Sequence, residues 1–188
     1  VSCCISLLIG EASLRLLRLG YNNSPMNPSL TSHHEHPYNF EFTAYSPTGE
    51  WGNFNIKYDE FGLRVLDRDC ETKNNKEGYN LIFLGDSFVE AIQVVSNDSF
   101  VGIVQNQLCE EASVVQNLGV SSYSPVLSFA HLLQQNKYNN KINVSKRSKI
   151  IHVLYDNDIE SDDEYAQSVK FSEEENNKSI VVENNLKL

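Results

Sequence analysis

The run Asn80-Leu81-Ile82-Phe83-Leu84-Gly85-Asp86-Ser87 decides the fold class of this chain. Its apolar residues are consecutive rather than alternating, which is typical of a parallel strand that is covered on both faces. Gly85 closes the run, and polar residues follow at once. The sequence therefore predicts a buried parallel strand with a serine just beyond its carboxyl end.

Two further predicted strands extend this strand into a sheet. A second strand is predicted at Ser113–Leu118, ending at Gly119, and a third at Lys149–Tyr155. Between them, Asn97-Asp98-Ser99 is typical of a helix cap, and Ser124-Pro125 is typical of a helix start. This alternation predicts right-handed crossovers and a parallel α/β sheet with helices on both faces.

The remaining segments are less regular. Residues 21–52 hold four of the five prolines and are expected to be loop, although Trp51–Tyr58 alternates like short β structure. The polar stretch 67–78 is expected to be a surface loop. The acidic stretch 160–175 is expected to be a solvated loop, and Ile180-Val181-Val182 an isolated β-like run.

Length and composition limit the possible classes. The chain has 188 residues, of which 40% are hydrophobic, so it can build one core. We divide it into an N-terminal apolar segment at 1–20, a linker with short β structure at 21–78, and a partial α/β domain at 79–188. The net charge of −10 argues against a partner that is a nucleic acid, which selects a basic face.

The cysteines and histidines do not predict a metal site. Cys3, Cys4, Cys70 and Cys109 form no CxxC pair, and no Cys/His group has the spacing of zinc ligands. Cys70 and Cys109 are expected to be free or buried rather than paired. We expect no metal and no cofactor.

The N-terminal segment allows two interpretations. Val1–Gly10 is almost wholly apolar, whereas about 20 apolar residues are needed to span a bilayer. One interpretation is the end of a membrane anchor that begins before Val1, and the change to Glu11 and Arg15 favours it. The other is an amphipathic helix that packs on the domain through its leucines: Leu7, Leu8, Leu14, Leu16, Leu17 and Leu19.

Ligands of open parallel sheets bind at the carboxyl ends of the strands. This rule selects three segments, Gly85–Phe88, Asn117–Val120 and Asp156–Asp158. Together they offer a hydroxyl, glycine N–H groups and a side-chain amide at one rim. Acyl transfer at a serine needs this combination of a nucleophile and donors for a developing oxyanion.

The same segments resemble the SGNH (GDSL-type) hydrolases. Leu84–Phe88 resembles the first block of that family, Asn117–Gly119 the second, and Asn157-Asp158 the third. The upstream Tyr58–Arg64 resembles a segment that membrane-anchored members carry just before the serine block. The resemblance covers residues 53–163 and implies a flavodoxin-like, three-layer parallel sheet that is incomplete at the C-terminus.

The resemblance also implies roles for the matching residues. Ser87 would be the nucleophile, and the oxyanion hole would combine the N–H groups of Ser87 and Gly119 with the side-chain amide of Asn157. Asp86 would fix the turn, and Asp158 would orient the backbone near it. Each has a structural alternative: Ser87 as a helix cap, Gly119 as a strand-ending turn, and Asn157 as an Asx turn.

Two departures from the family pattern matter. The family's base is a histidine about three residues after an aspartate near the end of the domain, and this chain has no histidine after His152. His152 precedes Asn157 by five residues, so we expect it about 16 Å down the third strand. His131 is expected to be a surface or packing residue, and His33, His34 and His36 are not expected to bind metal. Tyr155 occupies a place where family members often have glycine.

Two functions remain open. The first is a serine esterase or O-acyltransferase that acts on carbohydrate or lipid esters, anchored to a membrane and facing an extracytoplasmic space. The second is an SGNH-like binding module that keeps the pocket without the base. Because both ends of the chain are cut short against the family pattern, we expect a fragment of a longer protein that lacks the Asp/His block.

Overall fold

The computed structural model describes residues 2–17, 23–46, 48–67, 79–108, 112–138, 142, 147–156, 158, 160, 162, 169–174 and 177–182. Its centre is a parallel sheet of three strands, β5 (Tyr79–Gly85), β6 (Ala112–Gly119) and β7 (Ser148–His152). The strand order is β6-β5-β7, and Gly85 is in register with Gly119. The expected α/β class with a parallel sheet is confirmed at this level.

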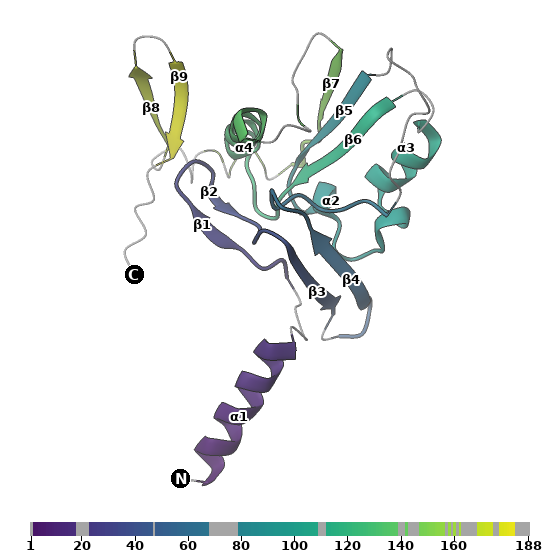
Figure 1. Ribbon diagram of the computed structural model, residues 1–188, viewed down its shortest axis with the longest axis vertical. Helices are drawn as coiled ribbons and strands as arrows, with labels where there is room; N and C mark the ends of the chain where they lie inside the picture. The colour runs from purple at the N-terminus through teal and green to yellow at the C-terminus, as the bar shows by residue number, and fades with distance from the viewer. Residues whose placement is uncertain are drawn as a thin grey trace.

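Two helices cover the two faces of this sheet (Figure 1). Helix α3 (Phe100–Leu108) packs against the face that carries Leu81 and Phe83, and helix α4 (Pro125–Tyr138) against the face that carries Ile82 and Leu84. Alternate residues of β5 therefore supply two cores, as a strand covered on both faces requires.

The helix starts agree with the sequence. The Ser99 Oγ atom accepts the Gly102 N–H at 3.1 Å and caps α3, and a short 3₁₀ helix, η1 (Ser96–Asp98), precedes it. The Ser124 Oγ atom accepts the Leu127 N–H at 3.3 Å at the start of α4.

The expectation that residues 21–52 are loop is wrong. It contains β1 (Asn27–Ser29), β2 (His33–Glu35) and β3 (Phe40–Tyr45), and β3 pairs antiparallel with β4 (Gly52–Tyr58). The prolines of this segment led to the loop prediction. The structure tolerates Pro28 within β1 because β1 and β2 form a two-stranded ribbon, where a missing N–H costs little. The predicted β structure at Trp51–Tyr58 is confirmed by β4.

The described part of the expected linker, 21–78, packs into the domain. Phe42, Ile56 and Tyr58 are buried in one cluster with Ile92, while Leu63 and Leu66 enter the two cores beside the parallel sheet. Arg64 forms single bridges with both Tyr58 and Asn117 and so joins β4 to β6.

The third strand differs from its expectation in both length and burial. β7 ends at His152 rather than Tyr155, and Ile150 and Ile151 are 43% and 40% exposed. Among the described strands β7 lies at the edge of the sheet, so its apolar side chains lack the cover that a central strand receives.

The acidic C-terminal region is not all loop. It contains β8 (Val169–Glu174), which pairs antiparallel with β9 (Asn177–Val182). The β-like run at Ile180–Val182 therefore lies in a hairpin and is not isolated.

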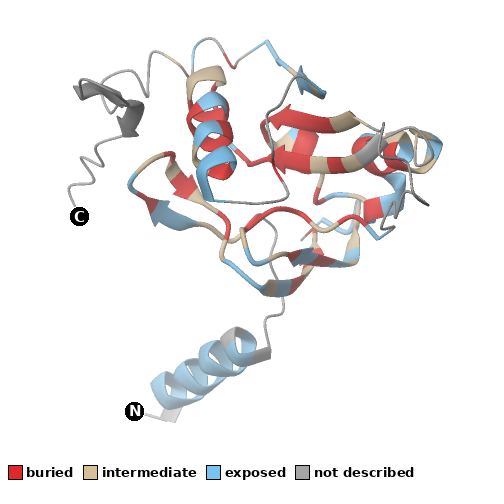
Figure 2. Ribbon diagram, turned by 45° about the horizontal axis from the view of Figure 1, so that its top comes forward, coloured by how far each residue is buried: buried red, intermediate tan, exposed pale blue. Residues whose placement is uncertain are grey.

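The N-terminal helix α1 (Ser2–Leu17) projects away from the domain, as Figures 1 and 2 show. Leu7, Leu8, Leu14 and Leu16 are exposed, so these leucines do not pack on the domain as the amphipathic interpretation expects. Leu19 and the side chain of Leu17 lie outside the described residues. Within the described part of the chain, no helix has both the length and the apolar character needed to cross a membrane.

Candidate functional site

A short helix, α2 (Ser87–Glu90), sits directly on the ends of β5 and β6. A Cβ atom added to Gly85 would lie 2.4 Å from the Cγ2 atom of Val89, and one added to Gly119 would lie 2.3 Å from the Glu90 nitrogen. A side chain at Gly119 would require the backbone of α2 to shift, and one at Gly85 would require the side chain of Val89 to move. The two glycines therefore form a seat that brings α2 and its first residue, Ser87, onto the rim of the sheet.

Asp86 caps this helix. Its side-chain oxygen accepts the Phe88 N–H at 2.9 Å, and Ser87 itself is partly exposed. Burial raises the pKa of the Asp86 carboxyl, the bond from Phe88 opposes that effect, and the negative charge of Asp158 adds to it. Asp86 and Asp158, from the first and third sequence blocks, are thus close enough for their charges to interact.

A second contact links these two blocks. The ring of Phe88 packs on the ring of Tyr155 with 4.6 Å between their centroids. Asp158 is buried, and its Oδ2 atom accepts the Tyr155 N–H at 2.7 Å, so it orders the backbone around it. Asn157, the proposed amide donor, lies outside the described residues.

Gly119 has a hydrogen-bonding partner that the sequence did not indicate. Its N–H donates to the Asn117 Oδ1 atom at 2.9 Å, and the Nδ2 atom of Asn117 donates to the Val89 carbonyl at 2.8 Å. Asn117, which is 1% exposed, thus ties β6 to α2. For the Gly119 N–H to stabilise an oxyanion, the Asn117 oxygen would have to release it.

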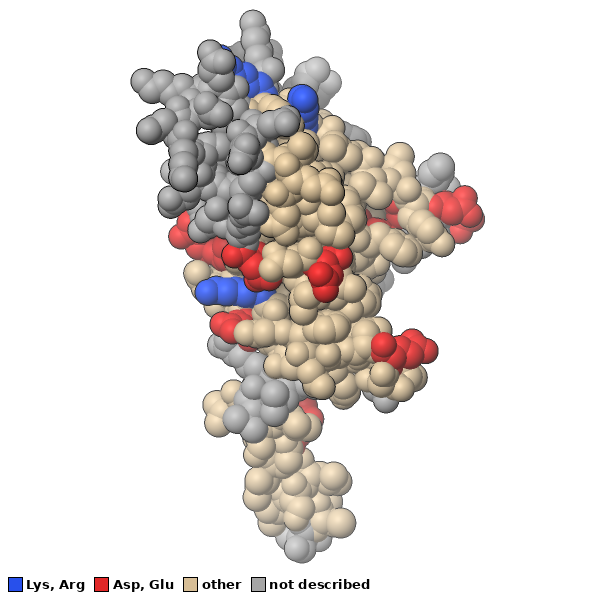
Figure 3. All heavy atoms as spheres, turned by 90° about the vertical axis from the view of Figure 1, so that its right-hand side faces the viewer, with Lys and Arg blue, Asp and Glu red and all other residues tan. Residues whose placement is uncertain are grey.

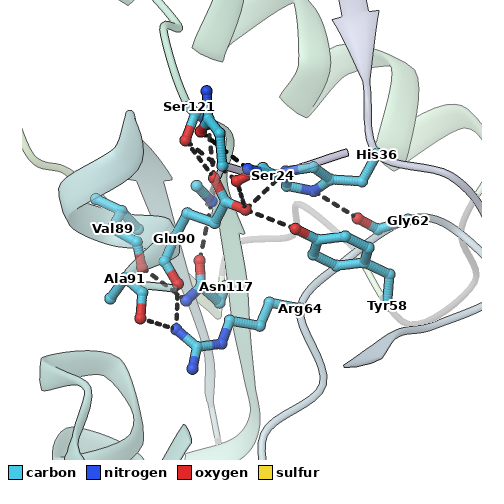
Figure 4. Close-up of polar contacts among 12 residues, drawn as sticks. Ser24, His36, Tyr58, Gly62, Arg64, Val89, Glu90, Ala91, Asn117 and Ser121 are labelled. Atoms are coloured by element: carbon cyan, nitrogen blue, oxygen red, sulfur yellow. Dashed lines mark hydrogen bonds and ion pairs between the residues drawn. The ribbon is translucent and has the colours of Figure 1, made fainter. Parts of the chain in front are cut away.

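The most extensive polar contacts surround Glu90, which sequence reasoning missed (Figure 4). The Oε1 atom of this fully buried residue accepts the hydroxyl of Tyr58 at 2.6 Å and the hydroxyl of Ser24. Its Oε2 atom accepts the Ser121 N–H at 2.9 Å and the Ser121 hydroxyl at 2.7 Å. The Nε2 atom of His36 lies 3.1 Å from Oε1.

These contacts keep Glu90 ionised. Burial alone would raise the pKa of the carboxyl, but the charge of His36 and the hydrogen bonds from His36, Ser24 and Tyr58 outweigh burial and lower it to about 2. The only sequence signal would have been an acidic residue one helical turn after Ser87, within an apolar stretch.

His36 faces an acceptor at each ring nitrogen. Its Nδ1 atom lies 3.0 Å from the Gly62 carbonyl, while Nε2 faces Glu90. The ring stacks on Tyr58 with a centroid distance of 4.1 Å and an angle of 4°. His36 therefore lies between the loop at Gly62 and the carboxylate of Glu90.

Arg64 holds the other end of α2. Its guanidinium donates to the carbonyls of Glu90, Ala91 at 2.5 Å and Val94 at 2.7 Å. These carbonyls lie at and beyond the C-terminus of the helix, where a cation is favourable. The family-like segment Tyr58–Arg64 therefore contacts the serine helix through both of its terminal side chains.

The other histidines do not reach Ser87 through a hydrogen bond within the described residues. His131 is buried beside Tyr123, and neither ring nitrogen has a hydrogen-bond partner among the described residues. Burial, with smaller effects of His36 and His34, lowers its pKa to about 3. The expectation of a packing residue agrees with this burial.

The position expected for His152, far down the third strand, is wrong. Because β7 ends at His152, it lies at the end of its strand, in register with Leu84 and close to the rim rather than far down the strand. Burial lowers the pKa of His152, whereas the charges of Asp158 and Asp162 oppose that effect.

The remaining histidines make local contacts. The Nε2 atom of His34 lies 2.8 Å from the Ser121 carbonyl, and its Nδ1 atom lies 2.9 Å from that of His33. Among the described residues, no group of three or more potential ligands could hold a metal ion. Cys70 and Cys109 lie outside the described residues.

Chemically, the rim offers a partly exposed hydroxyl, a capped helix and an adjacent aromatic pair. Neither the family models nor the curated proteins contain a match to this chain. Any assignment of function therefore depends on the residues at the rim.

Proposed function

We propose that this protein is a serine esterase or O-acyltransferase of the SGNH type, with Ser87 as the nucleophile. The observation that carries the proposal is the position of Ser87 on a helix seated on two strand-ending glycines, Gly85 and Gly119. The contact of Phe88 with Tyr155 supports it, because it joins the residue after Ser87 to the segment that precedes the third block.

The chemistry would proceed through an acyl-enzyme. The Ser87 Oγ atom would attack the ester carbonyl, form a tetrahedral intermediate and expel the alcohol, so the acyl group would move to the serine. Water would then release the acid in a hydrolase, and another alcohol would accept the acyl group in a transferase. The N–H groups of Ser87 and Gly119 and the amide of Asn157 are the proposed oxyanion donors.

The proton of the Ser87 hydroxyl needs an acceptor. Among the described residues, neither His131 nor His152 forms a hydrogen bond with Ser87. This observation favours the second candidate, a binding module that keeps the SGNH-like pocket without the base. It also predicts that the chain as it stands hydrolyses p-nitrophenyl acetate slowly, by residual catalysis only.

The proposed substrates are carbohydrate or lipid esters near a membrane. Helix α1 supports membrane contact because it carries a run of exposed apolar residues: Ile5, Leu7, Leu8 and Ile9. We propose an extracytoplasmic location on the same analogy. On the face in Figure 3, the described acidic side chains are spread out and the described basic ones form no single patch, which supports a partner other than a nucleic acid.

A thiol tests the site without a base. A thiolate is nucleophilic by itself near pH 9, so a Ser87→Cys variant should accept an acetyl group from p-nitrophenyl acetate. Cys3 and Cys4, exposed on α1, serve as reference thiols in the same chain. Peptide mass spectrometry gives the acetylation rate at each thiol, and iodoacetamide alkylation corrects for access and ionisation.

The ratio of acetylation to alkylation should be at least about tenfold higher at position 87 than at the reference thiols, because acylation alone passes through an oxyanion. Equal ratios would show that the rim has no functioning oxyanion hole. That result, combined with binding of an ester, would support the binding module instead.

A further inference from the structure

Helix α2 is too short to fix its own direction. It has only four residues, and the side chain of Glu90 and the carbonyls at its C-terminus contact segments far away in the sequence. Isolated helices of this length are unstable in water. The direction in which Ser87 points is therefore set by what holds α2 from outside.

We propose that Glu90 and Arg64 are positioning residues for Ser87, and that the N-terminal segment 24–64 aims the nucleophile through them. This inference rests on the proposed function, since it assigns a catalytic purpose to that direction. It also means that Ser24, His36 and Tyr58, which contact the carboxylate of Glu90, help to orient Ser87.

The first contact is the carboxylate of Glu90. Its Oε1 atom binds the segment before β5, through Ser24, His36 and Tyr58. Its Oε2 atom binds Ser121, which follows β6. One side chain on the serine helix is thus fixed to both the N-terminal strands and the loop after the second block.

The second contact is the guanidinium of Arg64. Its NH1 and NH2 atoms donate to carbonyls of Ala91 and Val94, at 2.5 Å and 2.7 Å, so the fork spans the turn that follows α2. The side chain is 3% exposed, and its backbone bridges to Asn117, which holds the Val89 carbonyl. Rotation of α2 would break contacts at both places.

The magnitude of the effect follows from the geometry of acyl transfer. A misplacement of about 1 Å in a reacting group costs roughly 100-fold in rate. Loosening the contacts of Glu90 or Arg64 should therefore lower oxyanion-dependent chemistry at residue 87. Alkylation at the same position should respond little, because it needs only an accessible thiolate.

The experiment uses the full chain carrying Ser87→Cys. Three variants are added singly: Glu90→Gln, Arg64→Lys and Tyr58→Phe. The last keeps the ring stacked on His36 and removes only the hydroxyl that reaches Oε1, so it is the variant most certain to fold. Lysine keeps the charge of Arg64 but cannot reproduce its fork.

Two controls separate positioning from stability. Glu41→Gln makes the same chemical change at an exposed glutamate on β3, and Ile56→Val removes one methyl group from the buried cluster of β4. Thermal unfolding of every variant shows that the folded population is the one that reacts.

We expect the ratio of acetylation to alkylation at position 87 to fall about tenfold in Glu90→Gln and Arg64→Lys and about threefold in Tyr58→Phe. Both controls should keep the parent ratio. An unchanged ratio in folded Tyr58→Phe and Arg64→Lys would overturn the positioning role and leave the proposed function standing. A parent whose ratio equals that of Cys3 and Cys4 would instead refute the proposed function, and the inference with it.

Discussion

The Nε2 atom of His36 lies 3.1 Å from the Oε1 atom of Glu90, and the side chains of both residues are almost completely buried. This contact constrains the whole domain, because removing His36 leaves the buried carboxylate of Glu90 without one of its partners. Measured losses for such changes are about 3–5 kcal/mol. The pair thus explains why the N-terminal strands and the serine helix should unfold together.

Ionised Glu90 should make the free energy of unfolding fall at acidic pH. Its pKa in the folded protein, about 2, is below the ordinary 4.5, so its contribution is complete above pH 4.5 and is lost as pH falls toward 2. Glu90→Gln should lower the free energy of unfolding at pH 7 by roughly 3–5 kcal/mol. Urea unfolding between pH 2 and 7 should show the gap from the parent closing below pH 4.5.

The control for that series is Glu41→Gln, which should stay within about 0.5 kcal/mol of the parent because it changes a surface position. A constant gap between Glu90→Gln and the parent down to pH 2 would contradict the assignment of an ionised Glu90.

His131 should affect the free energy of unfolding at a higher pH than Glu90 does. Its pKa is lowered from 6.5 to about 3 by burial, so the unfolded chain takes up a proton below pH 6.5 while the folded protein does not. Stability is therefore present above 6.5 and falls with pH, by up to about 1.4 kcal/mol per pH unit. His131→Leu should remove this slope between pH 6.5 and 4.5.

The same substitution should raise the free energy of unfolding at pH 7 by about 1 kcal/mol, because it removes two buried nitrogens for which the described part of the chain supplies no partner. Glu90→Gln is the comparison variant, since above pH 4.5 it should keep the change of unfolding free energy with pH that His131 causes. A destabilised His131→Leu with the parent's slope would show that the ring has a polar partner.

Gly119→Ala should disturb the seat of the serine helix. The added methyl group would lie 2.3 Å from the Glu90 nitrogen and 2.7 Å from the Val89 carbonyl carbon, both of them backbone atoms. We expect a loss of at least about 2 kcal/mol, as in other overpacked sites. Gly10→Ala, on the exposed helix α1 with no atom within 4 Å, should instead be neutral or slightly stabilising in the same urea titration.

Asn117→Asp changes one atom of the link between β6 and α2. The new oxygen cannot donate to the Val89 carbonyl and would face it instead. The expected loss is about 1–3 kcal/mol, which is the cost of a buried polar group left unpaired. Asn97→Asp, at an exposed position, is the matched control, and equal unfolding midpoints for the two variants would contradict the link.

The sequence predicts the central strands well because their signal is local. β5 is a short apolar run, β6 carries Val114, Val115 and Leu118, and both strands end at the glycine that was predicted. Burial of β7 was predicted from the same apolarity and is wrong, because the sequence does not show which strand lies at the edge of the described sheet.

The sequence also locates part of the candidate site. Ser87 and Asp86 follow β5 directly, so their position on the rim needs only the topology of a parallel sheet. The contacts of Glu90 could not be predicted, since its partners come from segments that lie together only after folding. The Asn117 bond to Gly119 was missed because a side chain and an N–H two residues apart look like ordinary strand neighbours.

The reach of Glu90 across the chain has a consequence for how the domain can be shortened. A minimal version that starts at β3 would keep every residue of the parallel sheet and of the serine block. It would nevertheless remove Ser24 and His36, leaving the carboxylate with only Tyr58 and Ser121 as partners inside an apolar interior. The smallest independently folding unit should therefore begin before Ser24, well upstream of the first strand of the parallel sheet.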